Sequence, residues 1–165
     1  MILPQLSFPI QSRIVFEETI VRDWYDGITS GLAMSKRLDT AFRFDIVAWG
    51  PQQEMRVFVL SRVNSEDFKE IVSLLSTKEA PNWPIWFPKW PIWESGSDPR
   101  KDVISHFLSK AKRPELAVAS DSMFEVLFAA KPLDDQTRSW LPSDFEGCPS
   151  RDNFDEWREF LSLPR

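Results

Sequence analysis

The chain has 165 residues, of which 42% are hydrophobic and 27% charged, and this is the length and composition of a single globular domain. A net charge of −5 argues against the basic face that nucleic-acid-binding proteins use to neutralise phosphates. The single cysteine, Cys148, excludes an intrachain disulfide, and no apolar run is long enough to span a membrane. Pro4 and Pro9 interrupt the N-terminal apolar stretch, which argues against a signal peptide. We therefore predict a cytoplasmic protein.

The first part of the chain, residues 13–62, is typical of β-structure. Residues 13–23 are rich in β-branched side chains, and the turn signal Tyr25-Asp26-Gly27 separates them from the alternating segment 28–36. One face of that segment carries only small side chains, which predicts the close approach of another backbone segment or side chain. A hairpin over 42–62 shows the clearest alternation. Because the connections are too short for helical crossovers, we expect antiparallel strands.

Helical and mixed patterns follow the strand-rich part. We expect helices over 65–76 and 98–112. Within 116–130 we expect two strands, 116–119 and 123–130, that turn at Ser120-Asp121-Ser122, with a helix over 123–130 as the alternative. After a polar, irregular stretch at 132–149, a last helix over 152–162 should bury Phe154, Trp157 and Leu161. These elements predict an α+β fold: a single domain with an antiparallel sheet of about four to six strands, covered on one face by about three helices.

Catalytic motifs are missing from the sequence. His106, the only histidine, lies away from the apolar stripe of its helix and should face solvent. Only His106 could act as a base for the Cys148 thiol. One histidine and one cysteine are too few ligands for a zinc site. No serine elbow and no phosphate-binding glycine loop occur. The sequence therefore predicts no catalytic residue, no metal and no cofactor, and favours a non-catalytic protein over an enzyme.

Two acids and two aromatic rings stand together at the end of the first predicted strand. Asp23, Trp24, Tyr25 and Asp26 could line a sugar or cation site, and the two carboxylates could serve a hydrolase. In the structural interpretation, Asp26 caps the turn and Asp23 is solvated. This pocket is the alternative functional prediction: a small-molecule or carbohydrate-binding protein, with hydrolysis by Asp23 and Asp26.

A Trp/Pro-rich segment at 83–93 is the most unusual feature of the sequence. It holds the tetrapeptide WPIW twice and half of the eight tryptophans, and its prolines prevent a regular helix. The indoles of Trp83, Trp86, Trp90 and Trp93 either cover the end of the core or form, with Lys89, an exposed contact surface. Membrane-surface contact is a further interpretation, for which the single Lys89 of this segment in an acidic protein gives little support.

Negative charge gathers at the C-terminal end of the chain. Residues 134–165 carry four Lys or Arg against eight Asp or Glu. The carboxylates of Asp152, Asp155, Glu156 and Glu159 form either a solvated helix face or a second docking surface. We therefore predict a non-catalytic interaction protein of the antagonist or adaptor type, which binds another protein, or a second copy of itself as a homodimer, through the Trp/Pro-rich surface.

Overall fold

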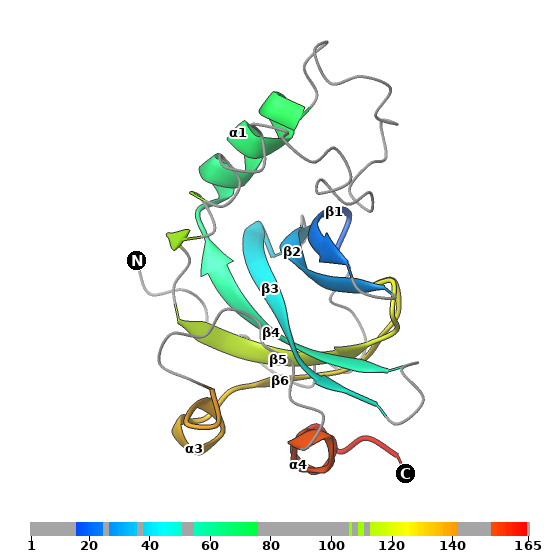
Figure 1. Ribbon diagram of the computed structural model, residues 1–165. Coiled ribbons are helices and arrows are strands. Elements are labelled where there is room, and N and C mark those ends of the chain that lie inside the picture. Colours follow the sequence, from blue (N-terminus) through cyan, green and yellow to red (C-terminus); the bar gives the residue numbers. More distant parts are fainter. Residues whose placement is uncertain are drawn as a thin grey trace.

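The computed structural model describes residues 16–24, 27–35, 38–50, 55–75, 106, 109–110, 113–141 and 153–164, of which the side chains of 22–24 and 74–75 are not described. This part of the chain forms six strands and three helices (Figure 1). The elements are β1 (Glu18–Trp24), β2 (Ile28–Ser35), β3 (Thr40–Trp49), β4 (Arg56–Val63), α1 (Ser65–Leu75), β5 (Pro114–Ser120), β6 (Leu127–Pro132), α3 (Asp135–Arg138) and α4 (Phe154–Phe160).

The six strands form one antiparallel sheet in the order of the chain, β1 to β6. This confirms the predicted α+β class and the antiparallel pairing. The sheet is strongly coiled, so the β5–β6 connection reaches the end of β2 (Figure 1). The Ile28 N–H donates to the Ser122 carbonyl oxygen at 2.8 Å across this junction. The inner face of the coiled sheet is thereby enclosed at one end.

The inner face of the sheet holds a core of phenylalanine rings. Phe124 stacks on Phe44 with ring centroids 4.3 Å apart and meets Phe58 edge-on at 5.0 Å. Such stacked and edge-to-face pairs contribute beyond the area that they bury. The buried members of this core are Val21, Ile28, Ala33, Phe42, Phe44, Ile46, Trp49, Phe58, Leu60, Leu116, Val118 and Phe124.

Gly31 explains why one face of β2 is built from small residues. It pairs with Val21 on one side and Phe44 on the other. A Cβ atom at this position would press against the Ile20 carbonyl oxygen and lie 2.9 Å from the Phe44 Cζ atom. The close approach expected from the sequence is confirmed here.

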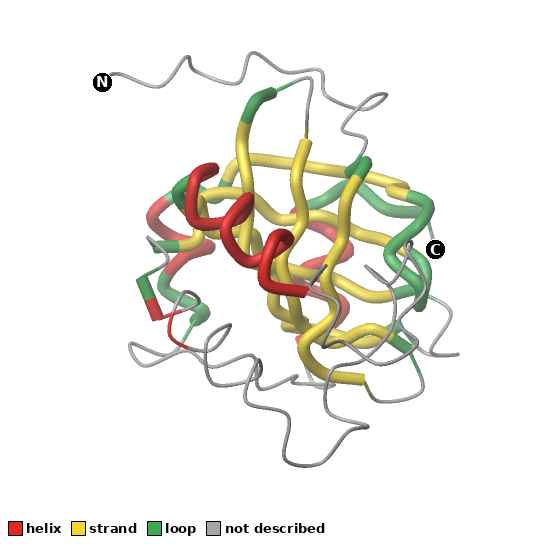
Figure 2. Tube along the Cα trace, turned by 90° about the horizontal axis from the view of Figure 1, so that it is seen from above, coloured by secondary structure: helices red, strands yellow, loops and turns green. Residues whose placement is uncertain are grey.

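Two helices cover the outer face of the sheet at opposite ends of β3. Phe68 and Ile71 of α1 pack on Ala41 and its neighbours, whereas Phe154 and Trp157 of α4 pack in the cluster that holds Val47. Figure 2 shows α1 lying across the strands. Both helices lie on one face of the sheet, as predicted. The helix expected over 98–112 lies almost wholly outside the described residues.

A fully buried arginine lies against the start of β2. Arg56 on β4 donates from Nη1 to the Ile28 carbonyl oxygen at 2.9 Å, and its guanidinium carbon lies 4.1 Å from the Trp49 ring centroid. Gly27, with φ of 133°, leaves room for this packing, since a Cβ atom there would lie 2.8 Å from Nη2 of Arg56 and 2.6 Å from the Ser122 carbonyl oxygen. Arg56 therefore links β2, β3 and β4 at the enclosed end of the sheet.

The structure corrects several predicted boundaries. The two strands predicted within 116–130 are present as β5 and β6, but the connection between them is longer than predicted, spanning residues 121–126, and β6 starts at Leu127 and not at Met123. Within the stretch expected to be irregular, residues 135–138 form the short helix α3. Helix α4 spans only 154–160, but Phe154, Trp157 and Leu161 are buried as predicted.

Candidate contact surface

The loop between β5 and β6 is organised by one carboxylate. An Asp121 oxygen, Oδ1, accepts from the Glu125 N–H at 2.7 Å and from the Val126 N–H at 3.2 Å. The Asp121 N–H in turn donates to the Val126 carbonyl oxygen at 3.2 Å. Aspartate commonly stabilises turns by accepting from nearby backbone donors in this way. Because the carboxylate takes two N–H groups that a strand would use, β6 begins later than its sequence predicts.

Phe124 fixes the inner side of this loop. Its φ is 55°, a conformation that is unfavourable for a bulky side chain. The ring is nevertheless buried against Phe44, Phe58 and Phe16 in the inner core. Core packing of the ring offsets the backbone strain, and the residues that follow are turned toward solvent.

A β-bulge at Phe128 sets the direction of the next side chains. Ala119 pairs with Ala129 and Ser120 pairs with Leu127, so Phe128 is an extra residue in β6. Leu127 and Ala130 pack on the inner core, whereas Ala129 packs on the outer one. The bulge shifts the alternation between these residues and leaves Phe128 without a place in either core.

Val126 and Phe128 are consequently exposed large hydrophobic residues, with 53% and 48% of their surface accessible. They lie at and next to the start of an edge strand, since β6 pairs with β5 and no other described strand lies beyond it. Exposed Glu125 and Lys131 flank them. We refer to residues 125–131 as the β6 edge. Exposed apolar side chains on an unpaired strand edge are typical of a binding surface.

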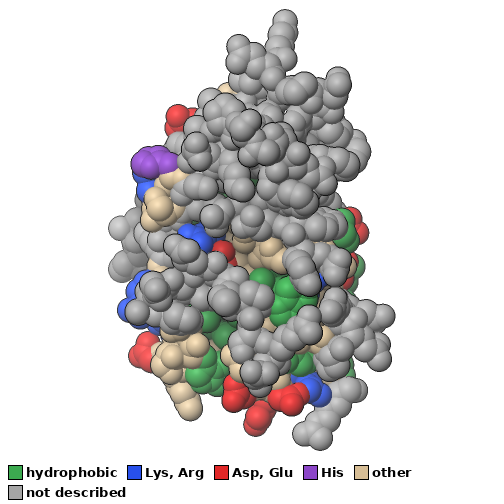
Figure 3. Space-filling view, viewed as in Figure 1, with side chains coloured by type: hydrophobic (Ala, Val, Ile, Leu, Met, Phe, Trp, Pro, Cys, Tyr) green, Lys and Arg blue, Asp and Glu red, His purple; other side chains and the backbone are tan. Residues whose placement is uncertain are grey.

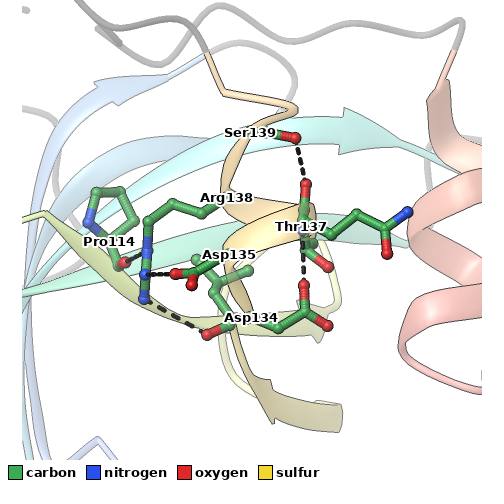
Figure 4. A network of polar contacts seen from close by, with 8 residues as sticks. Pro114, Asp134, Asp135, Thr137, Arg138 and Ser139 are labelled. Carbon is green, nitrogen blue, oxygen red and sulfur yellow. Dashed lines mark hydrogen bonds and ion pairs between the residues drawn. The ribbon is translucent and has the colours of Figure 1, made fainter.

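The far end of β6 is anchored by helix α3 (Figure 4). Arg138 donates from Nε to the Pro114 carbonyl oxygen at 3.0 Å and from Nη1 to Asp135 at 3.2 Å. Asp134 caps the helix by accepting from the Thr137 N–H at 2.7 Å, and this hydrogen bond lowers the pKa of the Asp134 carboxyl. With α3 tied to the start of β5 and the 121–126 loop tied to β2, both ends of β6 are held in place.

Lys131 connects the β6 edge to α4. Its Nζ donates to the Phe160 carbonyl oxygen at 3.3 Å and lies 4.3 Å from the centroid of the Phe160 ring. A lysine near the C-terminus of a helix is favourable because the last carbonyl groups are partly negative. An ammonium group has three donors, so Lys131 can bind a further acceptor while these contacts persist.

A second polar group lies on the outer face between the two helices. Arg43 and Asp45 on β3 form a two-point ion pair, with Nε to Oδ2 at 2.7 Å and Nη2 to Oδ1 at 3.3 Å. Ser30 and Ser61, both buried, pair with Asp45 and Arg43 on the neighbouring strands. A two-point pair of this kind satisfies the buried Asp45 carboxylate with the half-buried Arg43 guanidinium, so we interpret it as part of the packing between the α1 and α4 clusters.

Most of the contact residues predicted from the sequence lie outside the described residues. This applies to Trp83, Trp86, Lys89, Trp90, Trp93 and Asp152. The alternative pocket is also outside, because Tyr25 and Asp26 and the side chains of Asp23 and Trp24 are not described. The predicted contact role of these residues therefore stays a prediction.

The remaining predicted acids lie on α4 and point away from the sheet. Asp155, Glu156 and Glu159 are exposed, and acidic side chains gather at the end of the molecule where α4 lies (Figures 1 and 3). Asp155 forms an ion pair with Arg158 one turn later. Ordinary helix-surface pairing accounts for that contact, and the structure shows no further ligand group around these acids in its described part.

His106 is exposed, as its position on the predicted helix indicated. Within the described residues, no group of three or more His, Cys, Asp or Glu side chains is arranged to hold a metal ion. None of the described helices has both the length and the apolar character of a membrane-spanning segment.

Comparisons with family models, with curated proteins and with solved structures found no match for this chain.

Proposed function

We propose that the protein is a non-catalytic interaction protein of the cytoplasm and that the β6 edge is its contact surface. The observation that carries this proposal is the exposure of Val126 and Phe128, at 53% and 48%, on an edge strand held at both ends. Isolated exposed apolar side chains are common on protein surfaces. Here Phe128, the extra residue at a bulge, is exposed close to a second apolar residue, Val126, along the outermost strand of the described sheet.

Pre-organisation supports a binding role for this edge. Asp121 fixes the backbone of Glu125 and Val126, and Phe124 fixes the loop from inside. A surface that is already ordered loses less conformational entropy when a partner binds. Edge strands bind extended segments through backbone hydrogen bonds, and neighbouring side chains supply specificity. The arrangement therefore fits recognition of another polypeptide.

The Trp/Pro-rich segment remains a second proposed contact surface. Its residues are Trp83, Trp86, Lys89, Trp90 and Trp93, and the acids of α4 are proposed as a third. These surfaces are proposed from sequence composition, whereas the β6 edge is also supported by the exposure of its side chains.

Site-specific photo-crosslinking tests the proposal. A photoreactive phenylalanine analogue replaces Phe128 in one variant and Glu70, an exposed residue of α1, in a control variant. We expect a saturable protein adduct in the source lysate only from position 128, and we expect excess unlabelled wild type to compete it away. A Val126→Asp protein should compete poorly. Equal labelling from both positions, or none from position 128, would contradict the role of the β6 edge.

A further inference from the structure

The bulge at Phe128 interrupts a hairpin that is otherwise regular. In the pairs that β6 forms with β5 from its far end to Ala129, each step along one strand is matched by one step along the other, whereas Ser120 pairs with Leu127 and skips Phe128. Ala130 packs on the inner core and Ala129 on the outer one. Since successive side chains of a strand point to opposite faces, a β6 without the bulge would direct Phe128 to the inner face. The bulge gives that inner place to Leu127.

We propose that β6 has a second register without the bulge, in which Phe128 turns inward and the β6 edge loses its exposed apolar side chains. The inference rests on the proposed function, because it names how the contact surface is regulated. If the regular pairing continued past Ala129, Ser120 would lie opposite Phe128, and Ser122 opposite Val126. Val126 and Phe128 would then share the inner face. The three residues 123–125 would form the loop, a common length for a β-hairpin.

The bulged register is held by contacts that the second register would lose. Oδ1 of Asp121 accepts from the N–H groups of Glu125 and Val126, and the Phe124 ring stacks on Phe44 in the inner core. In the second register, Val126 would belong to the strand and Phe124 to the short loop. Asp121 therefore acts as a latch on the register in which Phe128 is exposed.

Other features favour the second register. The bulged one holds Phe124 at a φ of 55°, which is strained for a bulky residue, and leaves Val126 and Phe128 accessible to water. In the second register the core would exchange one phenylalanine for another, since Phe124 leaves as Phe128 enters. An exchange of like for like keeps the two states close in free energy, which is the condition for a switch.

The change of register involves only residues 123–128. The Ser122 carbonyl oxygen, which accepts from the Ile28 N–H at 2.8 Å, belongs to the arm of the hairpin that does not slide. At the other end, Arg138 of α3 stays on the Pro114 carbonyl oxygen. A partner that contacts Val126 and Phe128 binds the bulged register alone, so its binding shifts the population toward that register.

Fluorine NMR of the full chain tests the inference, with 4-fluorophenylalanine incorporated at position 128. We expect a main resonance that shifts between H2O and D2O, as an exposed ring does. A minor resonance without that solvent shift, at about 0.1–10% of the population, should exchange with it in saturation transfer. With the label at position 124, the main resonance should be the buried one, and the exposed minor resonance should have the same population.

Asp121→Ala tests the latch. It removes the acceptor of two backbone N–H groups, and hydrogen bonds to a charged group are among the stronger ones. The buried resonance of position 128 should therefore rise about tenfold or more relative to the exposed one. Asn64→Ala is the matched control, because it removes a side-chain oxygen that accepts from the Glu66 N–H at the start of α1. This variant should keep the wild-type ratio.

Three outcomes would overturn the inference. They are a wild type without a buried resonance down to about 0.1%, an Asp121→Ala protein with the wild-type ratio, and an Asn64→Ala protein with the same rise as Asp121→Ala. If circular dichroism shows that Asp121→Ala is unfolded, the matching populations at positions 124 and 128 of the wild type decide alone. A single register with crosslinking from position 128 would refute the switch and leave the contact surface standing. Two registers without any crosslinking would refute the contact surface and leave the switch standing.

Discussion

Replacing Trp157 with alanine should destabilise the protein strongly. Trp157 is the largest fully buried side chain among the described residues, and its ring centroid lies 5.1 Å from that of Trp140 and 6.1 Å from that of Phe160. Truncation of a buried tryptophan typically costs about 3–5 kcal/mol, because it loses burial and leaves a cavity. The two edge-to-face ring contacts account for about 0.5–1.5 kcal/mol each within that total.

Trp157→Phe is the matched control. The indole Nε1 of Trp157 is buried and has no hydrogen-bond partner within the described part of the chain, so we expect removal of the indole N–H to sacrifice no hydrogen bond there. Phenylalanine keeps a ring in the cluster, and we expect a cost below about 2 kcal/mol. Urea unfolding followed by far-UV circular dichroism measures both free energies of unfolding. A loss below about 1 kcal/mol for Trp157→Ala would refute the reasoning and show that α4 is a detachable tail.

Three further substitutions test the fold at single positions. Gly31→Ala should cost about 1–3 kcal/mol in urea unfolding, because its Cβ would press on a backbone carbonyl that cannot move aside; an unchanged stability would disprove the close packing of β1 on β2. Gly27→Ala should also cost about 1–3 kcal/mol, since a φ of 133° is unfavourable for a residue with a Cβ, and a thermal melt that matched the wild type would contradict this. The lowered pKa of Asp134 means that its charged form stabilises the fold above the usual pKa of 3.8 and that this contribution disappears as the pH falls through the lower folded value. Asp134→Ala should therefore lower the Tm at pH 7 and lose its effect near pH 2; a Tm difference that did not depend on pH would argue against the cap.

Local patterns in the sequence were sufficient for most of the sheet and for the buried faces of the helices. Alternation over 28–36 and 42–62 identified β2, β3 and β4, because a half-buried strand requires a period of two. For α1, the polar residue directly before the predicted helix, Asn64, caps it, with its side-chain oxygen accepting from the Glu66 N–H at 2.8 Å. Signals of this kind act over a few residues, so a single sequence contains them.

The β5–β6 hairpin shows where local reasoning failed. Residues 123–130 have the composition of a continuous strand, yet the strand starts only at Leu127. The delay depends on Asp121, which captures two N–H groups, and on Phe124, whose ring enters a core built by distant strands. Helix α3 was missed because a helix of four residues is too short to show a period, although its cap at Asp134 and Thr137 left a weak signal.

The sequence by itself determined the fold class, the antiparallel pairing and the buried face of α4, since these follow from short-range periodicity and from connection length. The tertiary structure decided which apolar residues stay outside. Val126, Leu127 and Phe128 are equally hydrophobic neighbours, and the sequence offers no reason to place one inside and the others in solvent. Coiling of the sheet brings Phe124 and Leu127 to the inner core, and the bulge then leaves Val126 and Phe128 exposed, because side-chain direction on a strand depends on register with its neighbour.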